Sequence, residues 1–172
     1  MTAAAMLLPP YNDFFKVGVS SSGNHDNNVY GDYWAEQNHG LREVTRPRTN
    51  TTTTAAGAEG NRTNDGDQTG GADQEQAETR FEIKVPANHE LAENLKGRLL
   101  LVHGDMDNNV HPAGTIRLAN ALIKANKRFD FMIMPGKPHG YGDYQAYFQR
   151  MMFEYFAEHL LGDYYRVGAD MR

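Results

Sequence analysis

The feature that most constrains this chain is the segment 99–112, LLLVHGDMDNNVHP. Its four consecutive apolar residues, 99–102, are typical of a strand that is buried on both faces, as in a parallel sheet. A polar loop with Asp105 and Asp107 follows at Gly104, and Pro112 suits the first turn of a helix because its missing N–H would be unpaired there. The segment therefore predicts a strand, an acidic loop and a helix. In open α/β sheets, sites form just past the carboxyl ends of such strands.

The same alternation continues along the chain. We predict strands at 14–19, 99–102 and 129–134, and helices at 2–8, 113–126 and 144–161. The helix 113–126 is expected to present one apolar face, made by Ile116, Ala119, Leu122 and Ile123. This order indicates an α/β fold in which parallel strands carry helices on their faces.

Composition separates one segment from the rest. Residues 45–80 contain almost no large apolar side chain, so burial cannot offset the entropy that ordering them would cost. We predict a disordered insertion that divides one α/β domain into residues 1–44 and 81–172. Two N-x-T triplets begin at Asn50 and Asn61, but such triplets arise easily by chance in a tract rich in Thr and Asn.

Charge and length exclude several classes of protein. The 172 residues are enough for a core, and the net charge of −5 argues against general nucleic-acid binding. No apolar run approaches the roughly 20 residues that span a bilayer. The absence of cysteine excludes disulfides, thiolate metal sites and cysteine nucleophiles.

Two side chains follow neighbouring predicted strands. Asp107 lies in the loop after the strand 99–102, and His139 lies in the loop PGKPHGYGD after the strand 129–134. Adjacent parallel strands would bring these loops to one edge of the sheet. A carboxylate that holds a neutral imidazole in one tautomer is part of a nucleophile-activating triad. An acid followed by a histidine, with the nucleophile before both, is the chain order of α/β-hydrolases.

Several segments together resemble the catalytic domain of serine peptidases of the prolyl oligopeptidase family, and most closely the dipeptidyl peptidase IV branch. They are MTAAAM, FFKVGVSSSGNHDNNVY, NLKGRLLLVHGDMDNNVHP and LIKANKRFDFMIMPGKPHGYG. The resemblance implies the C-terminal portion of an α/β-hydrolase fold with an incomplete sheet. It also implies that Asp107 is the catalytic acid and His139 the catalytic base.

The resemblance extends to substrate binding. Asn109 and Val110 match positions that line the substrate site, where Asn109 would bind a substrate carbonyl. Tyr30 and Trp34 fall near the aromatic wall around a small pocket that accepts proline. The implied substrate is a peptide cut after Pro or Ala, and no cofactor is implied.

One element of the family is absent from these residues. The nucleophile of the family sits in a G-x-S-x-G elbow, and none of the 172 residues forms that motif. We therefore expect Met1 to match an internal methionine of longer relatives. The nucleophile elbow and the propeller domain would lie in a missing N-terminal part of the same protein. We expect the chain alone to lack peptidase activity, and for the full-length protein a homodimer stays open.

Each assignment has an alternative. His139 can be a structural histidine of a Pro/Gly loop, and Asp105 or Asp107 can serve only to bind loop N–H groups. Residues His103, Asp105, Asp107 and His111 can be considered as metal ligands, although their alternation fits no strong template. Serines 20–22 follow a strand but lack an elbow.

Two other functions compete with the proline-directed peptidase. The first is another α/β-hydrolase, such as an acylaminoacyl peptidase or an esterase, with the same acid and base. The second is a non-enzymatic remnant that serves only as a binding surface.

Overall fold

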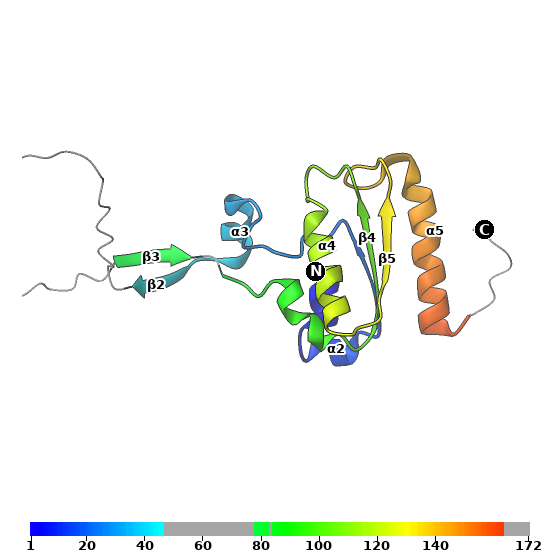
Figure 1. Cartoon of the computed structure of the whole chain (residues 1–172), viewed down its shortest axis with the longest axis horizontal. Coiled ribbons are helices and arrows are strands. Elements are labelled where there is room, and N and C mark those ends of the chain that lie inside the picture. Colours follow the sequence, from blue (N-terminus) through cyan, green and yellow to red (C-terminus); the bar gives the residue numbers. More distant parts are fainter. Residues whose placement is uncertain (47–77, 83, 164–172) are drawn as a thin grey trace, which may run out of the picture.

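The computed structural model describes residues 1–46, 78–82 and 84–163 (Figure 1). Its helices are α1 (Thr2–Leu7), α2 (Tyr11–Phe14), α3 (Asp32–His39), α4 (Ala113–Lys124) and α5 (Gln145–Phe156). Its strands are β1 (Val17–Ser21), β2 (Arg42–Arg46), β3 (Glu78–Glu82), β4 (Arg98–Gly104) and β5 (Asp130–Met134). The 3-10 helices Asn88–Asn94 and Gly142–Tyr144 and the π-helical turn Ala157–Leu161 complete the elements. Within the described ranges, no helix is both long and apolar enough to cross a bilayer.

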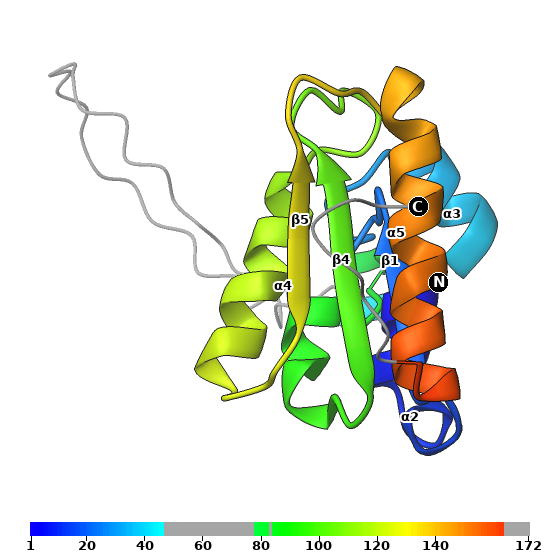
Figure 2. The same cartoon turned by 90° about the vertical axis from the view of Figure 1, so that its right-hand side faces the viewer.

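The main sheet has three parallel strands in the order β1–β4–β5. In its register Val19 lies opposite Leu100, and Val102 lies opposite Met132. The helices α1 and α4 cover one face of the sheet and α5 covers the other (Figures 1 and 2). The predicted α/β architecture, with parallel strands and flanking helices, is confirmed.

The central strand β4 separates two apolar cores. Leu99 and Leu101 point toward α1 and α4, whereas Leu100 and Val102 point toward α5. All four side chains are at most 4% exposed. Burial on both faces explains why the strand is a continuous apolar run instead of an alternating one.

Helix α4 is turned relative to the predicted apolar face. Ile116 and Ile123, which were expected to be buried, are 55% and 67% exposed. The residues that pack inward are Thr115, Leu118, Ala119 and Leu122. This stripe keeps the i, i+3, i+4, i+7 spacing of a helix face but includes a threonine, because Thr115 has a polar partner on β4.

The first predicted strand begins later than expected. Phe14 belongs to the short helix α2 and is 77% exposed, although it was assigned to a strand. Strand β1 begins at Val17, which pairs with Arg98, the first residue of β4. The start of β1 is thus determined by its pairing with β4, and the aromatic residues before it lie outside the sheet.

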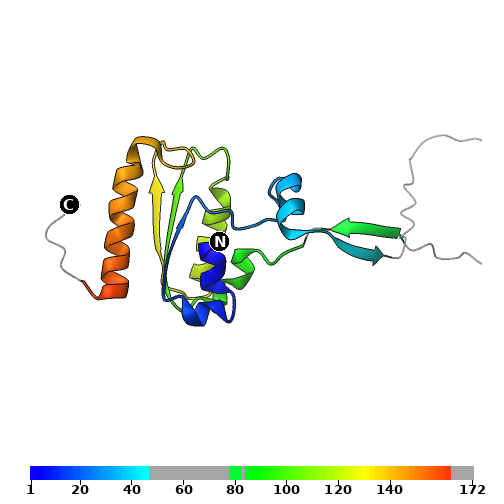
Figure 3. The same ribbon diagram turned by 180° about the vertical axis from the view of Figure 1, so that it is seen from behind.

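The ends of the predicted insertion 45–80 are ordered. Strands β2 and β3 form an antiparallel hairpin in which Thr45 pairs with Thr79 and Arg46 pairs with Glu78. The hairpin projects from the three-stranded body (Figures 1 and 3). Both predicted boundaries therefore fall inside strands, because backbone pairing holds residues of low apolar content. Residues 47–77 of the insertion lie outside the described residues.

Candidate active site

The loops after β4 and β5 are joined by hydrogen bonds at the carboxyl end of the sheet. The N–H of Met106 donates to the carbonyl of Lys137 over 3.1 Å, and Asp105 Oδ1 accepts the Gly136 N–H at 2.6 Å. A Cβ on Gly104 would lie 2.2 Å from the Lys137 carbonyl oxygen, so only glycine permits this approach. The loops that carry Asp107 and His139 are thus held side by side.

Asp107 and His139 form a hydrogen-bonded pair between these two loops. Nδ1 of His139 lies 2.8 Å from Oδ2 of Asp107. The Asp107 side chain is fully buried, whereas that of His139 is 43% exposed. Because a carboxylate only accepts, Nδ1 carries the hydrogen and Nε2 of the neutral ring is left as a base. In the described part of the chain, Nε2 has no hydrogen-bond partner.

The Asp107 carboxylate is held by its own loop as well. Its Oδ1 accepts the backbone N–H groups of Asn109 and Val110, both at 2.9 Å. Burial alone would raise the pKa of the Asp107 carboxyl. The hydrogen bonds from Val110, His139 and Asn109 outweigh burial and lower its pKa below the ordinary value. The pair therefore contains an ionised carboxylate at neutral pH.

Tyr141, which sequence reasoning did not single out, anchors the loop of the histidine. Its side chain is fully buried, and its hydroxyl lies 2.8 Å from Ser21 Oγ and donates to the Val102 carbonyl at 3.1 Å. The Ser22 N–H donates to the same hydroxyl oxygen. Its ring packs against Phe148 of α5 with centroids 4.9 Å apart. One side chain thus ties the loop to the ends of β1 and β4.

The predicted substrate residues divide into two groups. The Tyr30 hydroxyl donates to Asn109 Oδ1 over 3.3 Å, and the Tyr30 ring packs edge-on against Trp34 at 5.6 Å. The fold thus brings Tyr30 and Trp34 next to Asn109, which lies in the loop of Asp107 and far from them in sequence. Val110 differs from them because it is only 9% exposed and its backbone N–H binds the Asp107 carboxylate.

The residues considered as metal ligands have other partners. Asp105 binds the Gly136 N–H, and His111 Nδ1 accepts the Ala113 N–H at 3.1 Å. His103 is fully buried and its ring contacts Thr115, Val110 and Asp107. Within the described residues, no three His, Asp or Glu side chains are arranged to hold a metal ion.

The serine cluster is used by the fold. Ser21 is hydrogen-bonded to the Tyr141 hydroxyl, as described above, while Ser20 and Ser22 are buried. Within the described residues, no hydrogen bond joins any of the three to His139. Among the described residues, none of the three serine hydroxyls is hydrogen-bonded to a histidine.

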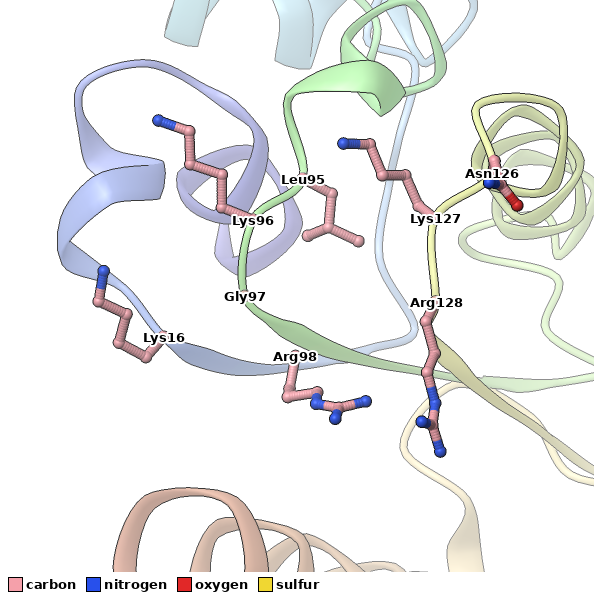
Figure 4. A pocket seen from close by; sticks show the side chains of 8 residues that line it. All are labelled: Lys16, Leu95, Lys96, Gly97, Arg98, Asn126, Lys127 and Arg128. Carbon is pink, nitrogen blue, oxygen red and sulfur yellow. The ribbon is translucent and has the colours of Figure 1, made fainter.

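A basic hollow of about 500 Å³ lies at the opposite end of the sheet, where β4 begins (Figure 4). Its lining consists of Lys16, Leu95, Lys96, Gly97, Arg98, Asn126, Lys127 and Arg128. Lys96 pairs with Asp13, and Lys16 donates to the Asp13 carbonyl. Lys127 and Arg128 follow the C-terminus of α4, where the helix dipole favours cations. Local structure accounts for these charges, and none of these residues contacts the Asp107–His139 pair.

The sequence profile of the prolyl oligopeptidase family matches residues 1–163. The chain belongs to the prolyl oligopeptidase family. The predicted membership of this family of serine peptidases is thereby confirmed.

Among similar solved structures, one shares the fold over most of this chain. A Bacteroides ovatus protein, provisionally assigned as a dipeptidyl aminopeptidase IV, aligns with a TM-score of 0.61 at 23% identity, over 92% of this chain and 18% of its own. The dipeptidyl peptidase 4 of Porphyromonas gingivalis is 33% identical over 39% of this chain and 10% of its own, with a TM-score of 0.34. The acylaminoacyl peptidase of Pyrococcus horikoshii is 21% identical over 49% of this chain and 14% of its own, with a TM-score of 0.41. No curated protein matches the chain. The chain therefore spans about a fifth of the first of these solved relatives.

Proposed function

We propose that this chain is the C-terminal part of the catalytic domain of a proline-directed serine peptidase, of the dipeptidyl or oligopeptidase type. In this proposal Asp107 is the acid and His139 is the base. The observation that carries it is the 2.8 Å hydrogen bond between a buried carboxylate and a half-exposed imidazole at the carboxyl ends of two adjacent parallel strands.

The chemistry follows from the tautomer of His139. With Nδ1–H donated to Asp107, Nε2 can take the proton of a serine hydroxyl as the hydroxyl attacks a peptide carbonyl. The protonated ring then gives this proton to the leaving amine, and a water molecule repeats the sequence to release the acyl group. Throughout, the ionised Asp107 stabilises the positive charge that forms on the ring.

The nucleophile of this mechanism would lie outside the 172 residues, since none of them forms a G-x-S-x-G segment. The nucleophile elbow and the propeller domain of the family would belong to the missing N-terminal part of the same protein. The chain alone is then inactive, although it supplies the acid and the base. The same proposal includes a peptide substrate cut after Pro or Ala, and it leaves a homodimer of the complete protein open.

Three side chains support a peptide as the substrate. Tyr30 and Trp34 form an aromatic wall, and the hydrogen bond from Tyr30 fixes the Asn109 amide beside the loop of the acid. We assign the aromatic pair to the pocket for proline, with Asn109 placed to bind a substrate carbonyl. We also assign Val110 to the lining of the site, next to the Asp107 carboxylate that its N–H binds.

The test is a substrate panel on the protein that includes the in-frame upstream segment with its G-x-S-x-G serine. Hydrolysis of Gly-Pro and Ala-Pro anilides supports the proposal, and Tyr30→Ala should raise KM for these anilides. Hydrolysis of aryl esters without either anilide would instead identify an esterase. Absence of any in-frame G-x-S-x-G upstream would indicate a non-catalytic remnant.

A further inference from the structure

A second imidazole touches the carboxylate of the proposed acid. His103 lies near the end of β4 and is fully buried. Its Nε2 is 2.8 Å from the Val110 carbonyl oxygen and 3.2 Å from Asp107 Oδ2. Its Nδ1 is 2.6 Å from the hydroxyl of Thr115, in the first turn of α4.

These contacts determine the tautomer of His103. A carbonyl and a carboxylate oxygen can only accept, so Nε2 must carry the hydrogen. In the neutral ring Nδ1 then accepts the hydrogen of the Thr115 hydroxyl. Every polar atom of this buried ring is thereby satisfied, as buried polar groups in native structures generally are.

The consequence for Asp107 is that both imidazole rings lie against its Oδ2. His139 donates to Oδ2 at 2.8 Å, and the two loop N–H groups bind Oδ1. His103 donates its Nε2–H to the Val110 carbonyl, and the same nitrogen lies 3.2 Å from Oδ2. The loop thus fixes one oxygen of the carboxylate. His103 holds that loop through the Val110 carbonyl, and its ring lies against the other oxygen.

We propose that His103 is a positioning residue, which orients the Asp107 carboxylate so that Oδ2 faces Nδ1 of His139. Thr115 in turn orients His103, so the alignment of the pair depends on a threonine in α4. The importance of this alignment for catalysis rests on the proposed function. The alignment itself is a property of the 172-residue chain and can be measured there.

A merely structural role would give a different result. If His103 served only to join β4 to α4, its loss would lower stability without changing the hydrogen bond of His139. The chain offers a matched control in His25, a second buried histidine, which is 4% exposed and bonded to Asn88. No hydrogen bond or ion pair joins His25 to Asp107 among the described residues.

The experiment is ¹⁵N–¹H NMR of the His139 ring in the 172-residue chain. It reports the tautomer and the rate at which Nδ1–H exchanges with water. In His103→Leu we expect this exchange to accelerate about fivefold, the factor for one hydrogen bond of ordinary net strength. His103→Gln retains a side-chain donor and should stay within about twofold of wild type. His25→Leu should leave the His139 signals unchanged.

A folded His103→Leu chain, with protected β4 amides and wild-type exchange at His139, would overturn the proposal. So would an equal change in His25→Leu. If His103→Leu does not fold, Thr115→Val decides, because it keeps the ring and removes the hydroxyl that orients it. Accelerated exchange in Thr115→Val supports the positioning role, and unchanged exchange rejects it. An inactive upstream-extended protein would contradict the proposed function without affecting these NMR results.

Discussion

Asp107 concentrates more interactions than its neighbours in the acidic loop. Its fully buried carboxylate accepts two loop N–H groups and the Nδ1–H of His139, and the His103 ring lies 3.2 Å from the same oxygen as His139. Charge-assisted hydrogen bonds of this kind are stronger than neutral ones, and leaving a buried carboxylate without them would be costly. At the residue scale, the site therefore depends on keeping this carboxylate ionised.

The pH dependence of stability should show this. The pKa of Asp107 is lowered in the folded chain, so its contribution to stability is fully present above the unfolded-state pKa of about 4. That contribution is lost as the pH falls through the lower folded-state value. In urea unfolding followed by circular dichroism, the gap in unfolding free energy between wild type and Asp107→Asn should shrink below about pH 4. A gap that stays constant from pH 6 to pH 2.5 would contradict this account of the carboxylate.

The Tyr141 hydroxyl gives a second prediction for a single residue. Tyr141→Phe removes a buried hydroxyl that binds Ser21, Ser22 and Val102, and we expect a loss of about 1–3 kcal/mol in the free energy of unfolding. Tyr144 is 40% exposed, so Tyr144→Phe is the control and should stay within about 0.5 kcal/mol of wild type. Equal urea midpoints for the two variants would show that the hydroxyl does not anchor the loop.

Sequence reasoning found some of these residues and missed others, for a physical reason. Asp107 and His139 follow strands in a fixed chain order, so a pattern along the chain can indicate them. Tyr141 and His103 act through partners on other elements, which only the fold brings near. One signal was present for His103, because a polar residue in a strand that is buried on both faces must find a partner.

At the scale of elements, the site depends on how closely the loops after β4 and β5 approach each other. The contact occurs at Gly104, where the backbone of one loop meets the Lys137 carbonyl of the other. Packing of β4 between two apolar cores holds both strands in the register that creates this contact. The geometry of the pair is thus a consequence of strand pairing.

Alanine substitutions at Gly104 and Gly114 distinguish the cost of this close approach from the general effect of replacing a glycine. Gly104→Ala places a Cβ 2.2 Å from a backbone oxygen, so we expect a loss of about 2–3 kcal/mol in the free energy of unfolding. Gly114 lies in the first turn of α4, with no atom within 4 Å of an added Cβ, and Gly114→Ala should stabilise by up to about 1 kcal/mol. Urea denaturation measures both variants. Similar free energies of unfolding for the two would contradict the role assigned to Gly104.

The helices and strands could be predicted from the sequence where the pattern of buried apolar residues defines them, and less accurately in other segments. Strand β4 follows from its apolar run and α4 from its spacing. The predicted orientation of α4 was wrong for Ile116 and Ile123. The face that packs inward includes Thr115 instead, whose hydroxyl is hydrogen-bonded to His103. The assignment of Phe14 to a strand was wrong, because apolar composition alone does not show which residues pair with a neighbouring strand.

At the scale of the whole molecule, the described residues form a partial α/β-hydrolase fold built on a three-stranded parallel sheet. Its three parallel strands carry the Asp107–His139 pair, and the hairpin β2–β3 projects from them. The fold class could be predicted from the alternation of strands and helices. The hairpin could not, because its strands contain few apolar residues and are held by pairing with each other.

The 172-residue chain itself should be inactive. Without a G-x-S-x-G serine, it should neither hydrolyse Gly-Pro anilides nor react with a fluorophosphonate probe, as measured by mass spectrometry of the intact chain. Labelling of any of serines 20–22 would contradict this prediction and indicate a nucleophile within the chain.

The most direct test of the central claim is the effect of Asp107→Asn on kcat of the protein extended upstream to its G-x-S-x-G serine. If Asp107 holds His139 in the tautomer that leaves Nε2 as the base, kcat should fall by about 10⁴-fold while the fold is retained. An extended protein that hydrolyses its peptide substrate equally well with Asp107→Asn would contradict the account.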